Sequence, residues 1–167
     1  MAPRVVIVGP PGSGKSTAAR LVAERLGLPA RDTDDDVERA AGSTIGDIFV
    51  EHGEDEFRRL EQVAVAEAIR DHDGVLALGG GAVLDQRTRD LLRGLTVVFL
   101  DVGIKDAASR IGLNRDRPLL LGNPRAQWIR LMAARRPVYE DVATARVDTD
   151  GKEADQVADE VTRLVEG

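Results

Sequence analysis

The chain has 167 residues, a formal net charge of −6 and no cysteine. This length is typical of one domain, residues 1–167, with a sizeable buried core, and the lack of cysteine excludes disulfides and thiolate metal sites. The acidic balance argues against a nucleic-acid or membrane-surface partner, and no run is long enough to span a membrane, so a cytoplasmic protein is expected. The two histidines, His52 and His72, are expected in surface turns.

The most specific pattern is G-x-x-x-x-G-K-[ST], a phosphate-binding loop, which residues 9–17 match as GPPGSGKST. A β-branched run precedes it and a helical run follows it, as the motif requires. Backbone N–H groups and the helix dipole would bind a β-phosphate, Lys15 would add charge for the β- and γ-phosphates, and Ser16 would ligate Mg²⁺. A glycine-rich turn without a ligand is the plainer alternative. The expected nucleotide-binding residues here are Gly12, Ser13, Gly14, Lys15, Ser16 and Thr17.

An acidic segment, RDTDDD, occupies residues 31–36. In an extended segment Asp32 and Asp34 would point to the same side, at the edge where open α/β sheets bind their ligands. A plainer alternative, weighed less for Asp32 and Asp34 than for Asp35 and Asp36, is that these acidic residues cap the N-terminus of the following helix and compensate its dipole.

Helices and strands are expected to alternate along the rest of the chain, which predicts a parallel sheet with right-handed crossovers. The expected strands are 5–8, 75–78, 96–100 and 145–148, with a short extended piece before residue 32. The expected helices are 16–26, 37–41, a segment capped by Ser43 and running to residue 52, 54–70, 85–93, 105–111, 124–136 and a final helix.

The helix at 54–70 has an apolar face and a charged pair beside it. The residues expected to face inward are Phe57, Leu60, Val63, Ala64, Ala68 and Ile69. Arg58 and Glu61 are three residues apart and can pair. The pair is either a solvated contact of little energy, or Glu61 orients Arg58 toward an anion.

Two loops carry further signals. Gly79, Gly80 and Gly81 follow a buried strand, which suggests a close approach of backbone to a ligand, although a plain turn needs only one or two glycines. Residues 112–123 lack a helical apolar face, and Arg110 and Arg117 lie in or beside them, so an arginine-rich lid over the phosphates is expected.

These features favour a small-molecule kinase over other nucleotide-binding proteins. A GTPase would need an N-K-x-D segment, which the sequence lacks. It would also need a D-x-x-G segment after a strand, whereas the loose match here, residues 71–74, precedes the expected strand 75–78. An ATP-driven motor would be expected to carry further regions. A nucleotide-binding regulatory domain without turnover is the non-enzyme alternative.

The ordered set of motifs resembles the shikimate kinase family over nearly the whole chain. The resemblance rests on the phosphate loop, residues 32–34 (DTD), 57–61 (FRRLE), 79–83 (GGGAV), 117–120 (RPLL) and 135–139 (RRPVY). It implies a P-loop kinase fold, an α/β three-layer sandwich with a five-stranded parallel sheet flanked by helices and a mobile lid at about residues 112–124. It also implies transfer of the γ-phosphoryl of Mg·ATP to the 3-hydroxyl of shikimate, giving shikimate 3-phosphate and ADP for aromatic amino-acid biosynthesis.

The resemblance assigns roles to individual residues. Arg58, braced by Glu61, and Arg135 would hold the shikimate carboxylate, and planar guanidinium groups suit that task. Asp34 would bind the ring hydroxyls and accept the proton of the attacking hydroxyl. The remaining acceptor contacts would be the backbone of Gly79, Gly80 and Gly81 and the walls formed by Phe49 and Phe57.

The resemblance also assigns residues that would contact Mg²⁺ and the nucleotide. Asp32 would reach Mg²⁺ through water, opposite Ser16, and Arg117 would meet the γ-phosphoryl group. Arg110 would stack on the adenine, with Lys152 as the nearest match to a second basic residue near the base. The spacing to Pro137 selects Arg135 over Arg136, although a slip of one residue would exchange them. A gluconate-type sugar-acid kinase is the runner-up, and a monomer is expected.

Overall fold

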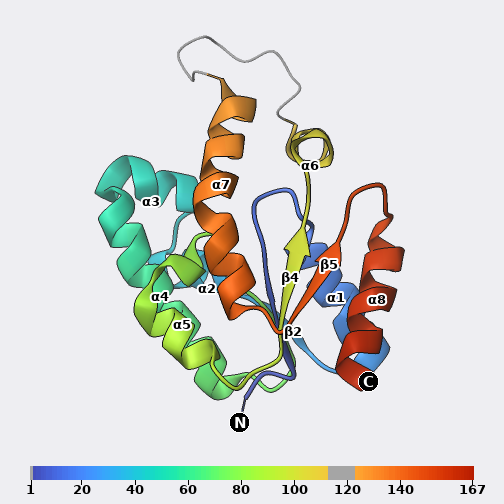
Figure 1. Ribbon diagram of the computed structural model, residues 1–167. Coiled ribbons are helices and arrows are strands. Elements are labelled where there is room, and N and C mark those ends of the chain that lie inside the picture. Colours follow the sequence, from blue (N-terminus) through green and yellow to red (C-terminus); the bar gives the residue numbers. More distant parts are fainter. Residues whose placement is uncertain (1, 113–122) are drawn as a thin grey trace.

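The structure, a computed structural model, describes residues 2–112 and 123–167 (Figure 1). Its centre is a sheet of five parallel strands in the order β2-β3-β1-β4-β5. The strands are β1 (Val5–Val8), β2 (Ala30–Asp32), β3 (Val75–Ala77), β4 (Val97–Asp101) and β5 (Ala145–Asp148). The predicted α/β architecture with a five-stranded parallel sheet is confirmed.

Helices alternate with the strands along the chain. They are α1 (Lys15–Leu26), α2 (Thr33–Ala41), α3 (Ile45–His52), α4 (Glu54–Asp71), the short 3₁₀ helix η1 (Ala82–Leu84), α5 (Gln86–Leu92), α6 (Ile104–Ile111), α7 (Pro124–Val142) and α8 (Ala154–Glu166). None of these helices is long and apolar enough to cross a membrane.

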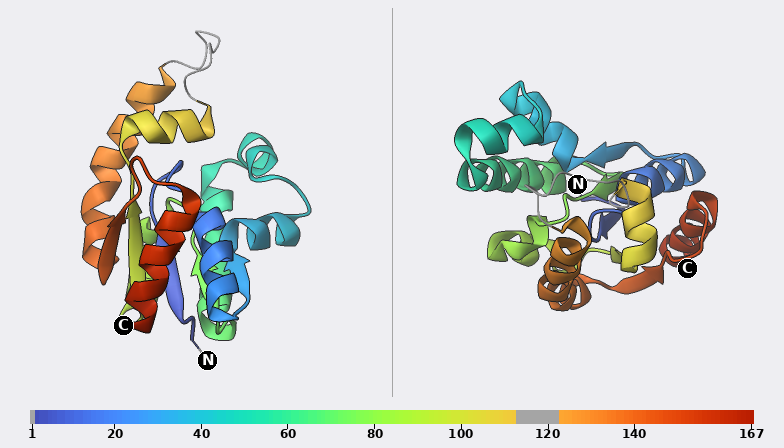
Figure 2. Two further views of the ribbon diagram at one scale, coloured as in Figure 1. Left: turned by 90° about the vertical axis from the view of Figure 1, so that its right-hand side faces the viewer. Right: turned by 90° about the horizontal axis from the view of Figure 1, so that it is seen from above.

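The sheet is covered on both faces, which explains its uninterrupted apolar strands. In β1, Val5 and Ile7 pack toward α1 and α8, whereas Val6 and Val8 pack toward α4 and α7, because successive side chains of a strand point to opposite faces. Two apolar layers therefore enclose the sheet, with α1 and α8 together on one side (Figure 2). A smaller apolar cluster joins α2 and α3 to α4.

The acidic segment folds differently from the expectation. Helix α2 begins at Thr33, four residues earlier than predicted, and Asp32 is its N-cap, accepting a hydrogen bond from the backbone N–H of Asp34 at 2.9 Å. Asp34 thus lies in the first turn of a helix rather than in an extended segment. Capping of a helix and extension of the strand are alternatives for this segment. Because β2 is a short strand at the edge of the sheet, a longer β2 would form few additional hydrogen bonds, and the capped helix forms instead.

Asp36 is a buried carboxylate engaged by two arginines. It accepts hydrogen bonds from Arg31 at 2.7 Å and Arg39 at 3.1 Å. This pairing explains why a charged residue, Arg31, stands in β2, because it neutralises an acidic side chain that α2 turns inward.

Three smaller expectations are wrong. Thr44, and not Ser43, caps α3 by accepting from the N–H of Asp47 at 3.1 Å. Val63 is 49% exposed, while its neighbour Val65 fills the core instead. His72 is only 8% exposed, and its Nε2 lies 3.1 Å from the carbonyl oxygen of Val75, so it is not a surface residue.

Helix α7 runs past its predicted end at residue 136. It continues through Pro137 to Val142, although a proline removes one helical N–H and crowds the preceding turn. Trp128, Met132 and Tyr139 lie at helical spacing and are all buried against the sheet. Burial of this face outweighs the local cost of the proline.

The carboxylate of Asp101, at the end of β4, ties α7 and β5 to the sheet. It accepts two hydrogen bonds from Arg136, at 2.8 and 2.9 Å, and one from Arg146 at 2.9 Å. Burial alone would raise the pKa of Asp101, but the hydrogen bonds from the two guanidinium groups lower it below its ordinary value.

We expect Asp101→Asn to lower the free energy of unfolding by about 1–3 kcal/mol at pH 7, because charge-assisted hydrogen bonds are lost. A carboxyl whose pKa is lower in the folded state stabilises the fold above its unfolded pKa, and this contribution disappears as the pH falls through the folded value. The difference between the variant and the wild type in urea unfolding should therefore shrink below about pH 4. Asp159→Asn, which alters a surface ion pair with Arg25, is the control. An equal difference at pH 7 and pH 3 would contradict this account.

Candidate active site

The phosphate loop, residues 9–17, joins β1 to α1 at the carboxyl ends of the strands and includes the first residues of α1 (Figure 1). Gly14 is the N-cap of α1 and has a left-handed backbone with φ of 86°. At Gly12, whose φ is 85°, an added Cβ would lie 2.9 Å from Cα of Ala107. Both glycines are therefore needed, one for its conformation and the other also for its close approach to α6.

Lys15 is half-buried at the start of α1, and its Nζ donates to the carbonyl of Pro10 at 3.1 Å. Burial lowers the pKa of Lys15 to about 8, and the nearby carboxylates of Asp34 and Asp32 partly oppose that shift. An anionic phosphate group beside this amine would favour its charged form.

Ser16 and Asp32 come together from α1 and the end of β2. The Ser16 hydroxyl donates to Oδ2 of Asp32. Both are oxygen ligands of the kind that Mg²⁺ prefers, and Mg²⁺ is usually held by one or two protein groups together with phosphate oxygens and water. No cluster of three or more acidic, histidine or cysteine side chains within residues 2–112 and 123–167 could hold a metal by itself. The pair therefore fits a metal bound jointly with a nucleotide.

Asp34 lies between the phosphate loop and the strand end of β3. Burial raises the pKa of Asp34 to about 6, with further contributions from the charges of Asp32 and Glu61, while Lys15 opposes the shift. A carboxylate with a pKa near 6 can accept a proton near neutral pH and remain mostly ionised there.

Three glycines after β3 bring the backbone against the predicted acceptor-binding side chains. An added Cβ at Gly79 would lie 2.5 Å from Oδ1 of Asp34, and one at Gly81 would lie 2.6 Å from the terminal nitrogens of Arg58. At Gly80 the corresponding distance to Nη1 of Arg135 is 3.2 Å. None of the three has a positive φ, so close approach accounts for these glycines.

Arg58 and Glu61 form an ion pair on α4, with Nη1 and Oε1 2.7 Å apart. Burial raises the pKa of Glu61, and the hydrogen bond from Arg58 opposes that shift. The guanidinium also lies over the ring of Phe57, 5.1 Å from its centroid, and Phe57 packs against Phe49 with ring centroids 4.9 Å apart. The guanidinium of Arg58 is thus held on one side by the buried Glu61 and on another by the ring of Phe57.

Arg135 and Arg136 have different surroundings, although they are adjacent in the sequence. Arg136 is engaged by Asp101 and lies 5.9 Å above the ring of Phe99. Arg135 lies beside Gly80, and no carboxylate in the part of the chain that the structure describes forms an ion pair with it. Arg135 is therefore the arginine available for an anion from outside the chain.

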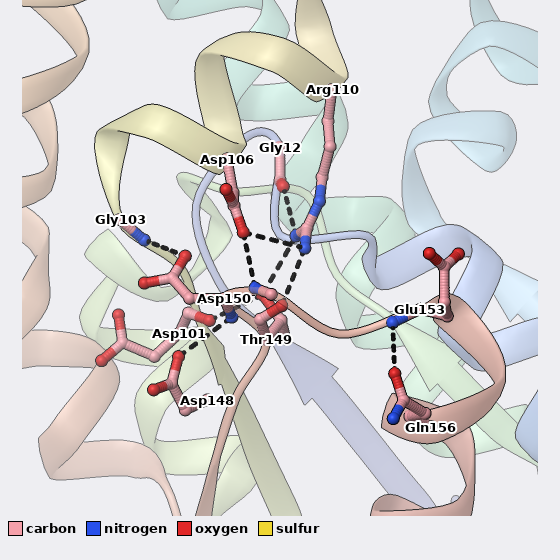
Figure 3. Close-up of polar contacts among 11 residues, drawn as sticks. Gly12, Asp101, Gly103, Asp106, Arg110, Asp148, Thr149, Asp150, Glu153 and Gln156 are labelled. Carbon is pink, nitrogen blue, oxygen red and sulfur yellow. Dashed lines mark hydrogen bonds and ion pairs between the residues drawn. The ribbon is translucent and has the colours of Figure 1, made fainter.

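Helix α6 and residues 149–152, which we term the base loop, lie beside the phosphate loop (Figure 3). Arg110 donates to the carbonyl of Gly12 at 3.0 Å, to the hydroxyl of Thr149 at 3.0 Å and to its carbonyl at 2.8 Å. The Lys152 amine pairs with Glu160 at 2.9 Å. Arg110 thus joins the phosphate loop to the base loop, a structural role that the sequence did not indicate.

One cavity of about 420 Å³ joins these parts, from the phosphate loop past Asp32 and Asp34 to the base loop. Its lining includes Gly12, Ser13, Gly14, Lys15, Ser16, Thr17, Arg110 and Lys152, together with apolar Ile111, Ala154 and Val157. The space suits a flat ring beside a chain of phosphates.

Two residues near the site were missed by sequence reasoning. The buried hydroxyl of Thr33 accepts from the N–H of Gly79 at 3.2 Å, and the hydroxyl of Tyr139 donates to the carbonyl of Gly80 at 2.6 Å. Thr33 lies between Asp32 and Asp34, so its position in the motif was the available signal.

Arg117, which was expected to contact the γ-phosphoryl group, lies outside the described residues.

Known proteins resemble this chain in sequence. Residues 11–166 match the family model described as shikimate kinase. A shikimate kinase of Streptomyces avermitilis is 57% identical, with 98% of this chain and 96% of that protein covered. One from Rhodococcus jostii is 48% identical, over 99% of this chain and all of the other.

Solved structures resemble it in fold. Shikimate kinase from Acinetobacter baumannii, in complex with shikimate, has a TM-score of 0.90 and 34% identity, covering 99% of this chain and 93% of that one. A gluconokinase from Sinorhizobium meliloti has a TM-score of 0.62 at 22% identity, covering 97% and 90% of the two chains, and shows the fold alone. The family match over almost the whole length and the close relatives lead to one conclusion: this chain belongs to the shikimate kinase family.

Proposed function

We propose that the protein transfers the γ-phosphoryl group of Mg·ATP to the 3-hydroxyl of shikimate. The observation that carries the proposal is the meeting of Asp34, Arg58 and Arg135 around the three glycines, directly beside the phosphate loop. An ionisable carboxylate and two guanidinium groups match an acceptor that bears hydroxyls and a carboxylate. The nucleotide cavity reaches Asp34 as well, so the donor and the acceptor would meet there.

The chemistry follows from this arrangement. The acceptor oxygen attacks the γ-phosphorus, the bond from that phosphorus to the β–γ bridging oxygen breaks, and ADP leaves. The proton of the hydroxyl passes to Asp34. Lys15 and the N–H groups at the start of α1 stabilise the negative charge on the phosphate oxygens, so positioning and electrostatics supply most of the rate enhancement.

Ser16 and, through water, Asp32 would hold Mg²⁺. When bound, the ion neutralises charge on the β- and γ-phosphate oxygens. The convergence of the Ser16 hydroxyl with Asp32 supports this assignment.

Further assignments come from the sequence. Arg110 and Lys152 would lie against the adenine, and the cavity lining supports this placement. Phe49 and Phe57 would wall the acceptor pocket. Arg117, within the segment 112–124 expected to act as a lid, would contact the γ-phosphoryl group. One kinase domain over residues 1–167, a monomer and a cytoplasmic location complete the proposal.

A coupled assay of ADP release tests the proposed reaction, with Mg·ATP and shikimate, gluconate or no acceptor. Release that depends on shikimate is expected. Release with gluconate alone would support a sugar-acid kinase. Nucleotide binding without turnover would support a regulatory domain.

Asp34→Asn should lower turnover about a hundredfold or more, because the amide cannot accept the proton. In the wild type, kcat/KM should fall as the pH drops below about 6, where Asp34 becomes protonated. Asp35→Asn is the control, because Asp35 lies on the same helix but is exposed. If Asp34→Asn keeps wild-type turnover, Asp34 is not the base.

Arg58→Lys should raise KM for shikimate about tenfold or more while leaving KM for ATP unchanged, because lysine lacks the planar fork that binds a carboxylate. Arg59→Lys is a matched control, since exposed Arg59 pairs with Glu56 on the same helix. A similar rise in both KM values would instead assign Arg58 a structural role.

A further inference from the structure

Three successive carbonyl groups of the phosphate loop accept hydrogen bonds, one from residues of the loop itself and two from other helices. The carbonyl of Pro10 accepts from the Ser13 hydroxyl at 2.8 Å and from Lys15 at 3.1 Å. The next carbonyl, of Pro11, accepts from Nε1 of Trp128 at 2.9 Å, and that of Gly12 accepts from Arg110. A carbonyl that turned toward a phosphate would repel it, so these contacts keep the loop in an anion-binding conformation.

Trp128 is the only tryptophan of the chain and lies on α7. It is 7% exposed and packs in the apolar layer that covers the sheet. An indole N–H can donate one hydrogen bond and accept none, so its contact with Pro11 is directional. The proposed reaction gives this residue no other role.

Tyr139 makes the equivalent contact at the other loop. Its buried hydroxyl donates to the carbonyl of Gly80 at 2.6 Å, and its ring stacks on Phe99 with centroids 5.1 Å apart. Burial raises the pKa of Tyr139, so the hydroxyl keeps the proton that it donates. Gly80 is the glycine that lies beside Arg135.

The two donors share one face of α7. Trp128 and Tyr139 are 11 residues apart, which is close to three helical turns and about 16 Å along the axis. One helix therefore contacts the loop that would hold the phosphates and the loop that would contact the acceptor. Figure 1 shows α7 beside the sheet, with its N-terminal end near the edge where the strands end.

We infer that Trp128 and Tyr139 are positioning residues through which α7 sets the phosphate loop and the acceptor loop relative to each other. Trp128 orients the phosphate loop, and Tyr139 orients the backbone of Gly80 together with Arg135. The inference rests on the proposed function for the identity of the two ligands, but each contact is tested by binding alone.

The experiment measures the dissociation constants of ADP and of shikimate separately, by calorimetry, for Trp128→Phe and Tyr139→Phe. Both replacements keep an aromatic ring and remove one donor. Trp128→Phe should weaken ADP binding about fivefold to tenfold and leave shikimate binding unchanged. Tyr139→Phe should weaken shikimate binding by a similar factor and leave ADP binding unchanged. A merely structural role for α7 would not separate the two ligands in this way.

Ile129→Ala is the matched control, because Ile129 is on the same helix and half exposed, and both affinities should stay at wild-type values. The wild type supplies a second measurement that needs no variant. ADP should change the emission of the sole tryptophan, since phosphates bound in the loop that Trp128 contacts change the electrostatic environment of the indole.

Equal weakening of both ligands in either variant, or affinities within twofold of the wild type, would overturn the inference. So would unchanged tryptophan emission when calorimetry records ADP binding. If the wild type binds ADP but not shikimate, the proposed function fails, while the response of ADP binding to Trp128→Phe still tests the phosphate-loop contact.

Discussion

The parallel pairing of β1 with β3 is the constraint on which the site depends. Val6 pairs with Leu76 and Ile7 with Ala77, and the N–H of Leu78 donates to the carbonyl of Ile7 at 3.1 Å. Because parallel strands end at the same edge, the phosphate loop after β1 and the three glycines after β3 emerge side by side. An added Cβ at Gly80 would lie only 3.5 Å from the carbonyl oxygen of Gly9. The loops for the two proposed substrates are thus adjacent through sheet register.

Around the two loops, some arginines are paired with carboxylates of the fold and others remain available for ligands. The chain is acidic overall, yet an anionic donor and acceptor require local positive charge. Arg136 is engaged by Asp101, and Arg31 by Asp36, so both serve the fold. Arg135 stays available beside the glycines, and Arg58 keeps one face braced by Glu61.

Burial shifts the pKa values of two charged groups of the site toward neutrality. Lys15 has a pKa of about 8 and Asp34 one of about 6, and the attraction between them opposes both shifts. Burial disfavours the charged forms of both groups, and an anionic ligand beside Lys15 would favour the charged amine. The contacts of α7 with both loops hold the backbone beside these groups in place.

The sequence by itself determined the phosphate loop, the alternation of strands and helices and the family, because these depend on local residue spacing and on an ordered set of motifs. It also indicated the pair of Arg58 and Glu61, since neighbours on a helix follow from the helical period. The spacing to Pro137 favoured Arg135 over Arg136, but only the tertiary structure showed how their surroundings differ, because Gly80 and Asp101 are remote from them in sequence. The same reason explains why the contacts of Trp128 and Arg110 were not predicted. The early start of α2 has a local cause, because capping by Asp32 replaced the expected extended conformation of the same segment.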